Sequence, residues 1–177
     1  SMLLMNSDGD IAVEALNLEV LRRRRVDGLI VSLESEVAPG TRTGLERFNG
    51  PIVLLDREVD ELDLGAVLCD HYSGVHAATT DLLARGHRKI ALITGSMDVR
   101  STRERLRAYR DAFADAGADP EDALLSIGQF TSDFSKSEVI RLMSRRPEPT
   151  ALITGGVLTT AGAIRARFFL YHPAPSE

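Results

Sequence analysis

The chain has 177 residues, of which 44% are hydrophobic, and it carries a formal net charge of −5. This length suits one large or two small domains with a packed core. The acidic balance argues against a basic face that grips nucleic acid. No apolar run approaches the ~20 residues that a membrane-spanning helix needs, and no secretion signal opens the chain.

The first half of the chain alternates short apolar runs with helical patterns. Strands are predicted where an apolar run is short and bounded by turn residues, and helices where apolar residues recur every three or four positions. The predicted strands are Leu3–Met5, Gly28–Ser32, Ile52–Leu55 and Ala66–Cys69. The predicted helices are Ala12–Arg25, a short one near Leu45–Phe48 after a polar loop over Glu34–Gly44, and one that Ser73 or a neighbour opens and Gly86 stops.

The stretch from Gly86 to Gly117 is the clearest strand–loop–helix unit. Ile90–Ile93 is apolar at every position, which is typical of a strand buried on both faces of a parallel sheet. Ser101 and Glu104 have the spacing of a helix capping box, and Gly117 is a natural helix stop. The loop between strand and helix therefore follows the carboxyl end of a strand, which is where ligands bind in open α/β sheets.

The rest of the chain continues this alternation. Strands are predicted at Leu124–Ile127 and Ala151–Thr154; one helix carries Val139, Leu142 and Met143, and another spans Leu158–Arg167. Residues 168–177 show no clear period, and two prolines there argue against a long helix. The alternation predicts βαβ units and a mostly parallel sheet. We expect two α/β lobes, residues 1–86 and 87–177, divided at Gly86–Arg88.

Motifs of common catalytic and cofactor sites are missing. The sequence contains no G-x-G-x-x-G, no G-x-x-x-x-G-K-[ST] and no G-x-S-x-G. Its four histidines fit no metal-ligand spacing, and we expect them to be exposed or hydrogen-bonded. The single cysteine, Cys69, fits a reducing compartment and is expected to be a buried small hydrophobe. We therefore expect no metal, no cofactor and no enzyme; an α/β hydrolase or kinase is disfavoured.

Several segments together resemble the LacI/GalR family of bacterial transcription regulators, in their periplasmic-binding-protein-like effector domain. The specific part is GHRKIALITG, followed by RERL and then GQF in this order. The resemblance covers residues 3 to about 165. The matching runs are LLMNSDGD (3–10), LRRRRVDGLIVS (21–32), PIVLLDR (51–57), CDHYSGVHAATTDLLARGHRKIALITG (69–95), STRERLRAYRDAFADAG (101–117), GQFTSDFS (128–135) and PEPTALIT (147–154).

The resemblance implies a two-lobed, type I periplasmic-binding-protein-like fold with doubly wound parallel sheets, here incomplete. It implies that a small effector, such as a sugar or nucleoside, binds between the lobes and changes the DNA affinity of a helix-turn-helix that these residues lack. It also implies a homodimer, a cytoplasmic location and no membrane contact. A periplasmic sugar-binding protein of a transport system is the alternative with the same fold.

Six residues are candidates for binding the effector. By resemblance, Arg103 matches an arginine that reaches the effector, and Phe130 matches an aromatic side chain that stacks on it. Each candidate also has a structural interpretation: an ion pair for Arg103 and for Asp56 with Arg57, core packing for Phe130, helix capping for Ser73 and loop solvation for Asp98. The candidates are Arg103, Phe130, Asp56, Arg57, Ser73 and Asp98.

Three departures from the family pattern bear on these expectations. The helix-turn-helix, the hinge and the first strand and helix of the first lobe are not among the residues that match. Gly156 and Val157 stand where the family has asparagines, and an apolar Val157 cannot bond a hydroxyl. The ending FFLYHPAPSE does not resemble the family's continuation, so we expect a truncated end. Because a missing first strand leaves unpaired strand edges, we expect dimerisation, exchange of elements or another strand order.

Overall fold

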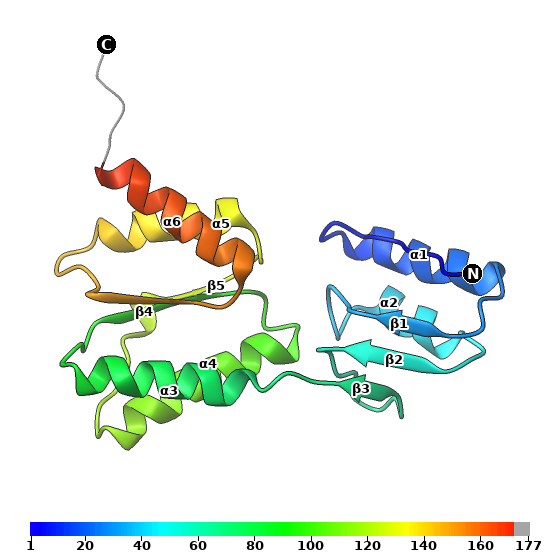
Figure 1. Cartoon of the computed structure of the whole chain (residues 1–177), viewed down its shortest axis with the longest axis horizontal. Coiled ribbons are helices and arrows are strands. Elements are labelled where there is room, and N and C mark those ends of the chain that lie inside the picture. Colours follow the sequence, from blue (N-terminus) through cyan, green and yellow to red (C-terminus); the bar gives the residue numbers. More distant parts are fainter. Residues whose placement is uncertain (172–177) are drawn as a thin grey trace, which may run out of the picture. The chain divides into compact units, whose positions relative to one another are not determined.

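The chain divides into two compact units, each with its own parallel sheet. The computed structural model describes residues 1–171 (Figure 1). Unit 1 contains residues 1–69 and 98–101, and unit 2 contains residues 70–97 and the chain from residue 102 onward. The division after Cys69 lies earlier than the expected one at Gly86–Arg88. The reason is that Leu83, on the helix before Gly86, packs in the same core as Ile90.

Unit 2 is a three-layered α/β/α arrangement. Its sheet has the order β5-β4-β6, and both neighbours pair with β4 in parallel. Helices α3 and α4 cover one face, and α5 and α6 cover the other (Figure 1). The strands are β4 (Ile90–Thr94), β5 (Leu125–Ile127) and β6 (Ala151–Thr154); the helices are α3 (His71–Ala84), α4 (Arg100–Asp115), α5 (Ser132–Met143) and α6 (Val157–Tyr171), and a 3-10 turn, η1 (Asp122–Leu124), precedes β5.

Strand β4 is the centre of unit 2. Its side chains alternate between the two faces of the sheet. Ile90 and Leu92 pack with Tyr109 and Phe113 of α4, whereas Ala91 and Ile93 pack against α5 and α6. All five residues of β4 are buried, as the apolar run predicted. The Tyr109 hydroxyl donates a hydrogen bond to the Ile90 carbonyl at 2.7 Å, which fixes α4 along the strand.

Unit 1 has a smaller sheet that is covered on one face. The parallel strand order is β1-β2-β3, and α1 and α2 pack on the same side through Leu18, Leu45 and Phe48. On the opposite face Ile30 is 74% exposed and Val67 is 61% exposed. The elements are α1 (Ile11–Arg23), β1 (Leu29–Val31), α2 (Pro39–Glu46), β2 (Ile52–Leu55) and β3 (Gly65–Val67).

The α/β architecture with parallel sheets is confirmed, and five local predictions are corrected. Residues Leu3–Met5 are extended but pair with no strand. Helix α2 begins at Pro39, not near Leu45, because proline is favoured in the first helical turn. Helix α4 begins at Arg100, so Ser101 lies inside its first turn and not at the capping position.

The other two corrections concern Cys69 and the last helix. Cys69 is exposed, because β3 ends at Val67 and is itself exposed at all three positions. Helix α6 continues to Tyr171, beyond the predicted end at Arg167. The prolines at 173 and 175 lie outside the described residues.

Three helices end in the same way, with a residue in the left-handed conformation. Gly86 after α3 and Gly117 after α4 have φ of 91° and 65°. After α4, the Ala118 amide donates to the Phe113 carbonyl and the Gly117 amide to that of Ala114, which is the Schellman pattern. Helix α1 ends at Arg23, and Arg25, two residues further on, has φ of 52°, where an L side chain is strained.

Exchanging side chains at these positions should change stability in opposite directions. Arg25→Gly is expected to raise the free energy of unfolding by about 0.5–1 kcal/mol, because glycine adopts positive φ without the Cβ clash. Gly117→Ala is expected to lower it by about 1 kcal/mol, although a Cβ there meets nothing within 4 Å. Urea unfolding monitored by circular dichroism measures both. Equal effects of the two variants would contradict the assignment of strain to Arg25.

A buried carboxylate fastens α1 to the loop after β1. Glu14 is 4% exposed, and it accepts hydrogen bonds from the Thr41 hydroxyl and the Glu34 amide, each at 2.6 Å. Burial raises the pKa of Glu14 above its ordinary value of 4.5, and these two bonds oppose the rise. The folded chain therefore holds a proton on Glu14 at pH values where the unfolded chain has lost it.

This raised pKa predicts a specific pH dependence. The stabilisation associated with protonated Glu14 is fully present below pH 4.5 and is lost as the pH rises through the raised pKa. Glu14→Gln should remove this decline in urea unfolding measured between pH 4 and 7. Glu138→Gln is the control of opposite sign, since Arg141 lowers the pKa of Glu138 and its stabilisation is lost as the pH falls. A decline that persists in Glu14→Gln would contradict the assignment.

Candidate functional site

In unit 2, the carboxyl ends of all three strands lead into loops that contain glycine. Gly95 follows β4, Gly128 follows β5, and Gly155 and Gly156 follow β6. A Cβ at Gly155 would lie 2.5 Å from the Thr94 hydroxyl oxygen, so the loops after β4 and β6 approach closely. These glycines leave room at the carboxyl edge of the sheet, the edge where α/β proteins bind ligands.

Phe130 occupies this room. A Cβ at Gly95 would lie 2.0 Å from the Phe130 ring, and one at Gly156 would lie 3.7 Å from it. The ring therefore lies against the glycine backbone after β4 and close to that after β6. Phe130 is half-buried. The Phe130 side chain thus packs against the glycine backbone, as the structural interpretation expected, and part of its ring stays exposed.

Arg105 and His71 lie beside this ring. The Arg105 guanidinium carbon is 5.7 Å from the Phe130 ring centroid, within the range of a cation–π contact. Its Nη2 donates to His71 Nδ1 at 3.1 Å. Because arginine only donates, Nδ1 carries no proton in this contact and Nε2 is the ring's N–H. An aromatic face, a cation and an imidazole donor thus gather at one edge of unit 2.

Arg103, the sequence-based candidate, contacts the loop before α4. Arg103 Nη1 donates to the Met97 carbonyl at 3.1 Å, and Glu104 bonds Arg107 at 2.6 Å. Residues two apart on a helix face different directions. Arg105 and His71 were missed in the sequence reasoning, although both lie inside runs that match the family. The spacing of RERL does not tell which of its two arginines lies near Phe130. That depends on the position of α4 in the fold.

Ser73 and Val157 also have defined positions in unit 2. Asp70 caps α3 by accepting the Ser73 amide at 2.9 Å, so the cap is a neighbour of Ser73, whose side chain is exposed. Val157 is 86% exposed as the first residue of α6.

In unit 1, Asp56 and Arg57 hold together the loops that follow the strands. Asp56 has φ of 55° and accepts the Cys69 amide at 3.2 Å. Arg57 donates to the carbonyls of Leu33 and Asp56, and its Nη1 lies 3.8 Å from the Asp56 carboxylate. The predicted structural ion pair is therefore present, and Arg57 joins the loop after β1 to the loop after β2.

Asp98 belongs to unit 1 through contacts with the loop after β1. Its carbonyl accepts the Glu36 amide at 3.0 Å, and its carboxylate lies 3.5 Å from the Ser35 hydroxyl. The buried Glu36 carboxylate accepts the amides of Glu58 and Arg100 at 3.0 and 2.8 Å. Asp98 is thus part of a connected set of loops, not the solvated loop residue of the structural interpretation.

Within residues 1–171, no helix is both long enough and apolar enough to cross a bilayer. Parallel sheets, with polar and aromatic groups beyond the carboxyl ends of their strands, define a binding-protein type of α/β fold. The chain belongs to the family described as periplasmic binding proteins and sugar binding domain of the LacI family, whose model matches residues 1–168.

Named relatives agree with this family. The ribose operon repressor of Escherichia coli (strain K12) is 31% identical over 169 residues, which cover 95% of this chain and 51% of the relative. The crystal structure of the transcription regulator CcpA of Lactococcus lactis has a TM-score of 0.86 at 25% identity, covering 99% of this chain and 64% of that one. A complex of the regulator CelR with cellobiose has a TM-score of 0.77 at 28% identity, covering 91% and 49%. The chain therefore spans about half the length of the curated relatives it matches.

The close contact between the Phe130 ring and the Gly95 backbone can be tested by adding one methyl group at Gly95. Gly95→Ala is expected to displace the ring and to lower the free energy of unfolding by about 1–3 kcal/mol, because the new Cβ overlaps the ring. Gly74→Ala in α3 is the matched control: a Cβ there meets nothing within 4 Å, and stability should rise by up to about 1 kcal/mol. Denaturant unfolding measures both. An undisturbed Gly95→Ala variant would show that Phe130 does not occupy this position.

Proposed function

We propose that this chain is the effector-binding part of a LacI-type transcriptional regulator. The observation that carries the proposal is the group formed by Phe130, Arg105 and His71 at the carboxyl edge of the unit 2 sheet. The proposed effector is a small sugar-like or nucleoside-like molecule. Family membership supports regulation over catalysis, and we propose no enzymatic step.

The chemistry of these three side chains suits such an effector. The flat, partly exposed ring of Phe130 can stack on the apolar face of a sugar ring or on a base. The guanidinium of Arg105 offers several donors in a fixed fork, which suits hydroxyls or a carboxylate, and His71 offers one more. The structure of CelR, a relative with 28% identity, contains cellobiose. This supports a carbohydrate as the first class of compound to test.

The other parts of the proposal concern the whole regulator. We propose that it acts in the cytoplasm as a homodimer and binds DNA through a helix-turn-helix that these residues do not contain. Effector binding would change the DNA affinity of that module through a coupling free energy between the two sites. Asp56, Arg57, Asp98, Ser73 and Arg103 stay proposed as further effector contacts. In the structure their described contacts fasten loops or a helix start, so the primary contacts proposed are Phe130 and Arg105.

A thermal-shift screen with pentoses, hexoses, cellobiose and nucleosides tests the proposal. A true effector at 100 times its Kd should stabilise the chain by about 2.7 kcal/mol, which is readily seen as a higher Tm. For the best compound, Phe130→Ala and Arg105→Ala should each weaken binding by roughly 10–100-fold in isothermal titration calorimetry, because a stacking surface or a charged donor is lost.

Two arginines on the same helix provide the controls. Arg110→Ala should leave affinity unchanged, since Arg110 is exposed and lies 3.6 Å from the Asp122 carboxylate. Arg103→Ala distinguishes the sequence-based assignment from the structural one: we expect a smaller loss than for Arg105→Ala. A larger loss in Arg103→Ala would restore the sequence-based assignment. If no compound of these classes stabilises the chain, the effector proposal for this chain is wrong.

A further inference from the structure

A row of polar and aromatic side chains joins α3 to α4 in unit 2. The Tyr72 hydroxyl donates to the Asp111 carboxylate at 2.9 Å, and the Arg107 guanidinium carbon lies 4.0 Å from the Tyr72 ring centroid. About one turn further along α3, His76 Nε2 lies 2.9 Å from the Asp115 carboxylate. The His76 ring also stacks on Tyr72, with 5.5 Å between the centroids. The two helices are thus joined at two successive turns.

These contacts fix how α3 lies along α4. His71, the first residue of α3, bonds Arg105, and the next residue of α3 bonds Asp111. The partners follow the same order along both helices, so α3 and α4 run in the same direction with a single register. Arg105 and Arg107 lie two residues apart and therefore face different directions from α4. Two adjacent residues of α3 are thus each held by a different arginine of α4.

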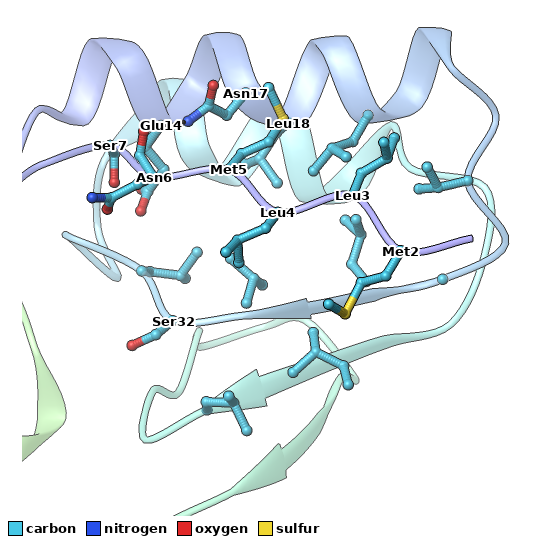
Figure 2. Close-up of a pocket in the computed structure, with 18 of the residues that line it drawn as sticks. Met2, Leu3, Leu4, Met5, Asn6, Ser7, Glu14, Asn17, Leu18 and Ser32 are labelled. Carbon is cyan, nitrogen blue, oxygen red and sulfur yellow. Dashed lines mark hydrogen bonds between the residues drawn. The ribbon is translucent and has the colours of Figure 1, made fainter.

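The first two turns of α3 have little apolar packing to hold them. Residues 71–78 include none that is fully buried, and of these only Val75 packs in the core. The first buried residue of α3 is Thr79, whose hydroxyl donates to a carbonyl of its own helix. Helix α1 of unit 1 is fastened differently, because Glu14 extends from it beside Ser7 (Figure 2) and is buried against the loop after β1. The start of α3 depends instead on partly exposed contacts to α4.

Helix α4 holds the partners of Tyr72 in place by contacts of its own. The Arg107 guanidinium bonds Glu104 at 2.6 Å and lies 3.7 Å from the Asp111 carboxylate. Acidic residues three positions before and four positions after an arginine can hold its side chain on the helix surface. The hydrogen bond to Asp111 raises the pKa of Tyr72 above its ordinary value of 10, so the hydroxyl keeps the proton that it donates. The Tyr72 side chain therefore meets a fixed cation and a fixed acceptor.

We propose that Tyr72 is a positioning residue for the effector site of unit 2. Its contacts to Arg107 and Asp111 hold the first turn of α3 in its register along α4. That register brings His71 to Arg105, so the two side chains keep a fixed spacing. Tyr72 acts through these two residues and needs no contact with the effector. The proposal rests on the proposed function, because the spacing matters for binding only if an effector binds there.

The test measures the contact between His71 and Arg105 directly and needs no effector. In the unaltered chain, nuclear Overhauser effects should connect the His71 ring to the Arg105 side chain. Tyr72→Ala removes both the ring and the hydroxyl, and the folded variant should lose these effects. Tyr72→Phe keeps the ring beneath Arg107 and should only weaken them. Asp111→Ala removes the same hydrogen bond from the side of α4 and should also weaken them, which provides a second variant if Tyr72→Ala does not fold.

Asp81→Ala is the matched control in α3, because Asp81 pairs with Arg85 of the same helix. This variant should keep the Overhauser effects of the unaltered chain, and their loss would overturn the proposal. Urea unfolding separates positioning from stability. If the Tyr72 and Asp111 variants lose stability but keep the full contact between His71 and Arg105, the role of Tyr72 is merely structural and the proposal is wrong. Failure of the thermal-shift screen, in contrast, would overturn the proposed function alone.

Discussion

Burial of a parallel strand on both faces is the constraint on which this structure depends. A parallel sheet needs helices on both sides, and β4 meets that need with alternate residues packed against α3 and α4 or against α5 and α6. Because helices cover both faces, the loops at the carboxyl edge are a place where a ligand can reach the sheet. The glycines after β4 and β6 keep side chains off this edge, and Phe130 is seated there with Arg105 beside it. The candidate site is thus a consequence of how the core is closed.

Unit 1 satisfies the same constraint only in part. Helices α1 and α2 cover one face through Leu18 and Leu45, while Ile30 and Val67 stay exposed on the other. The edge of β1 is open as well, and the N-terminal segment runs beside it without pairing. The polar loops of this unit are nonetheless well connected, through Glu14, Glu36 and Arg57. Unit 1 therefore combines well-connected loops with an apolar sheet face that stays exposed.

The architecture could be predicted well from the sequence, because apolar periodicity marks the strands and helices and glycines mark where the helices end. The apolar run at Ile90–Ile93, the helix stops at Gly86 and Gly117, and the strand Ile52–Leu55 all have local causes, and the structure confirms them. Its errors came from features that only the fold decides. Cys69 is exposed because β3 is an edge strand, and Leu3–Met5 has no strand to pair with. The choice between Arg103 and Arg105 depended on which side of α4 faces Phe130, which no spacing rule provides.

The central claim is that the carboxyl edge of unit 2 binds a small carbohydrate or nucleoside beside Phe130. The most direct measurement is a nitrogen-15 NMR titration of the chain with the compound that stabilises it best. The account predicts saturable shifts of the amides of Gly95 and Gly156, which lie next to the Phe130 ring. Shifts confined to residues far from this edge, such as Gly117 at the end of α4, would contradict it.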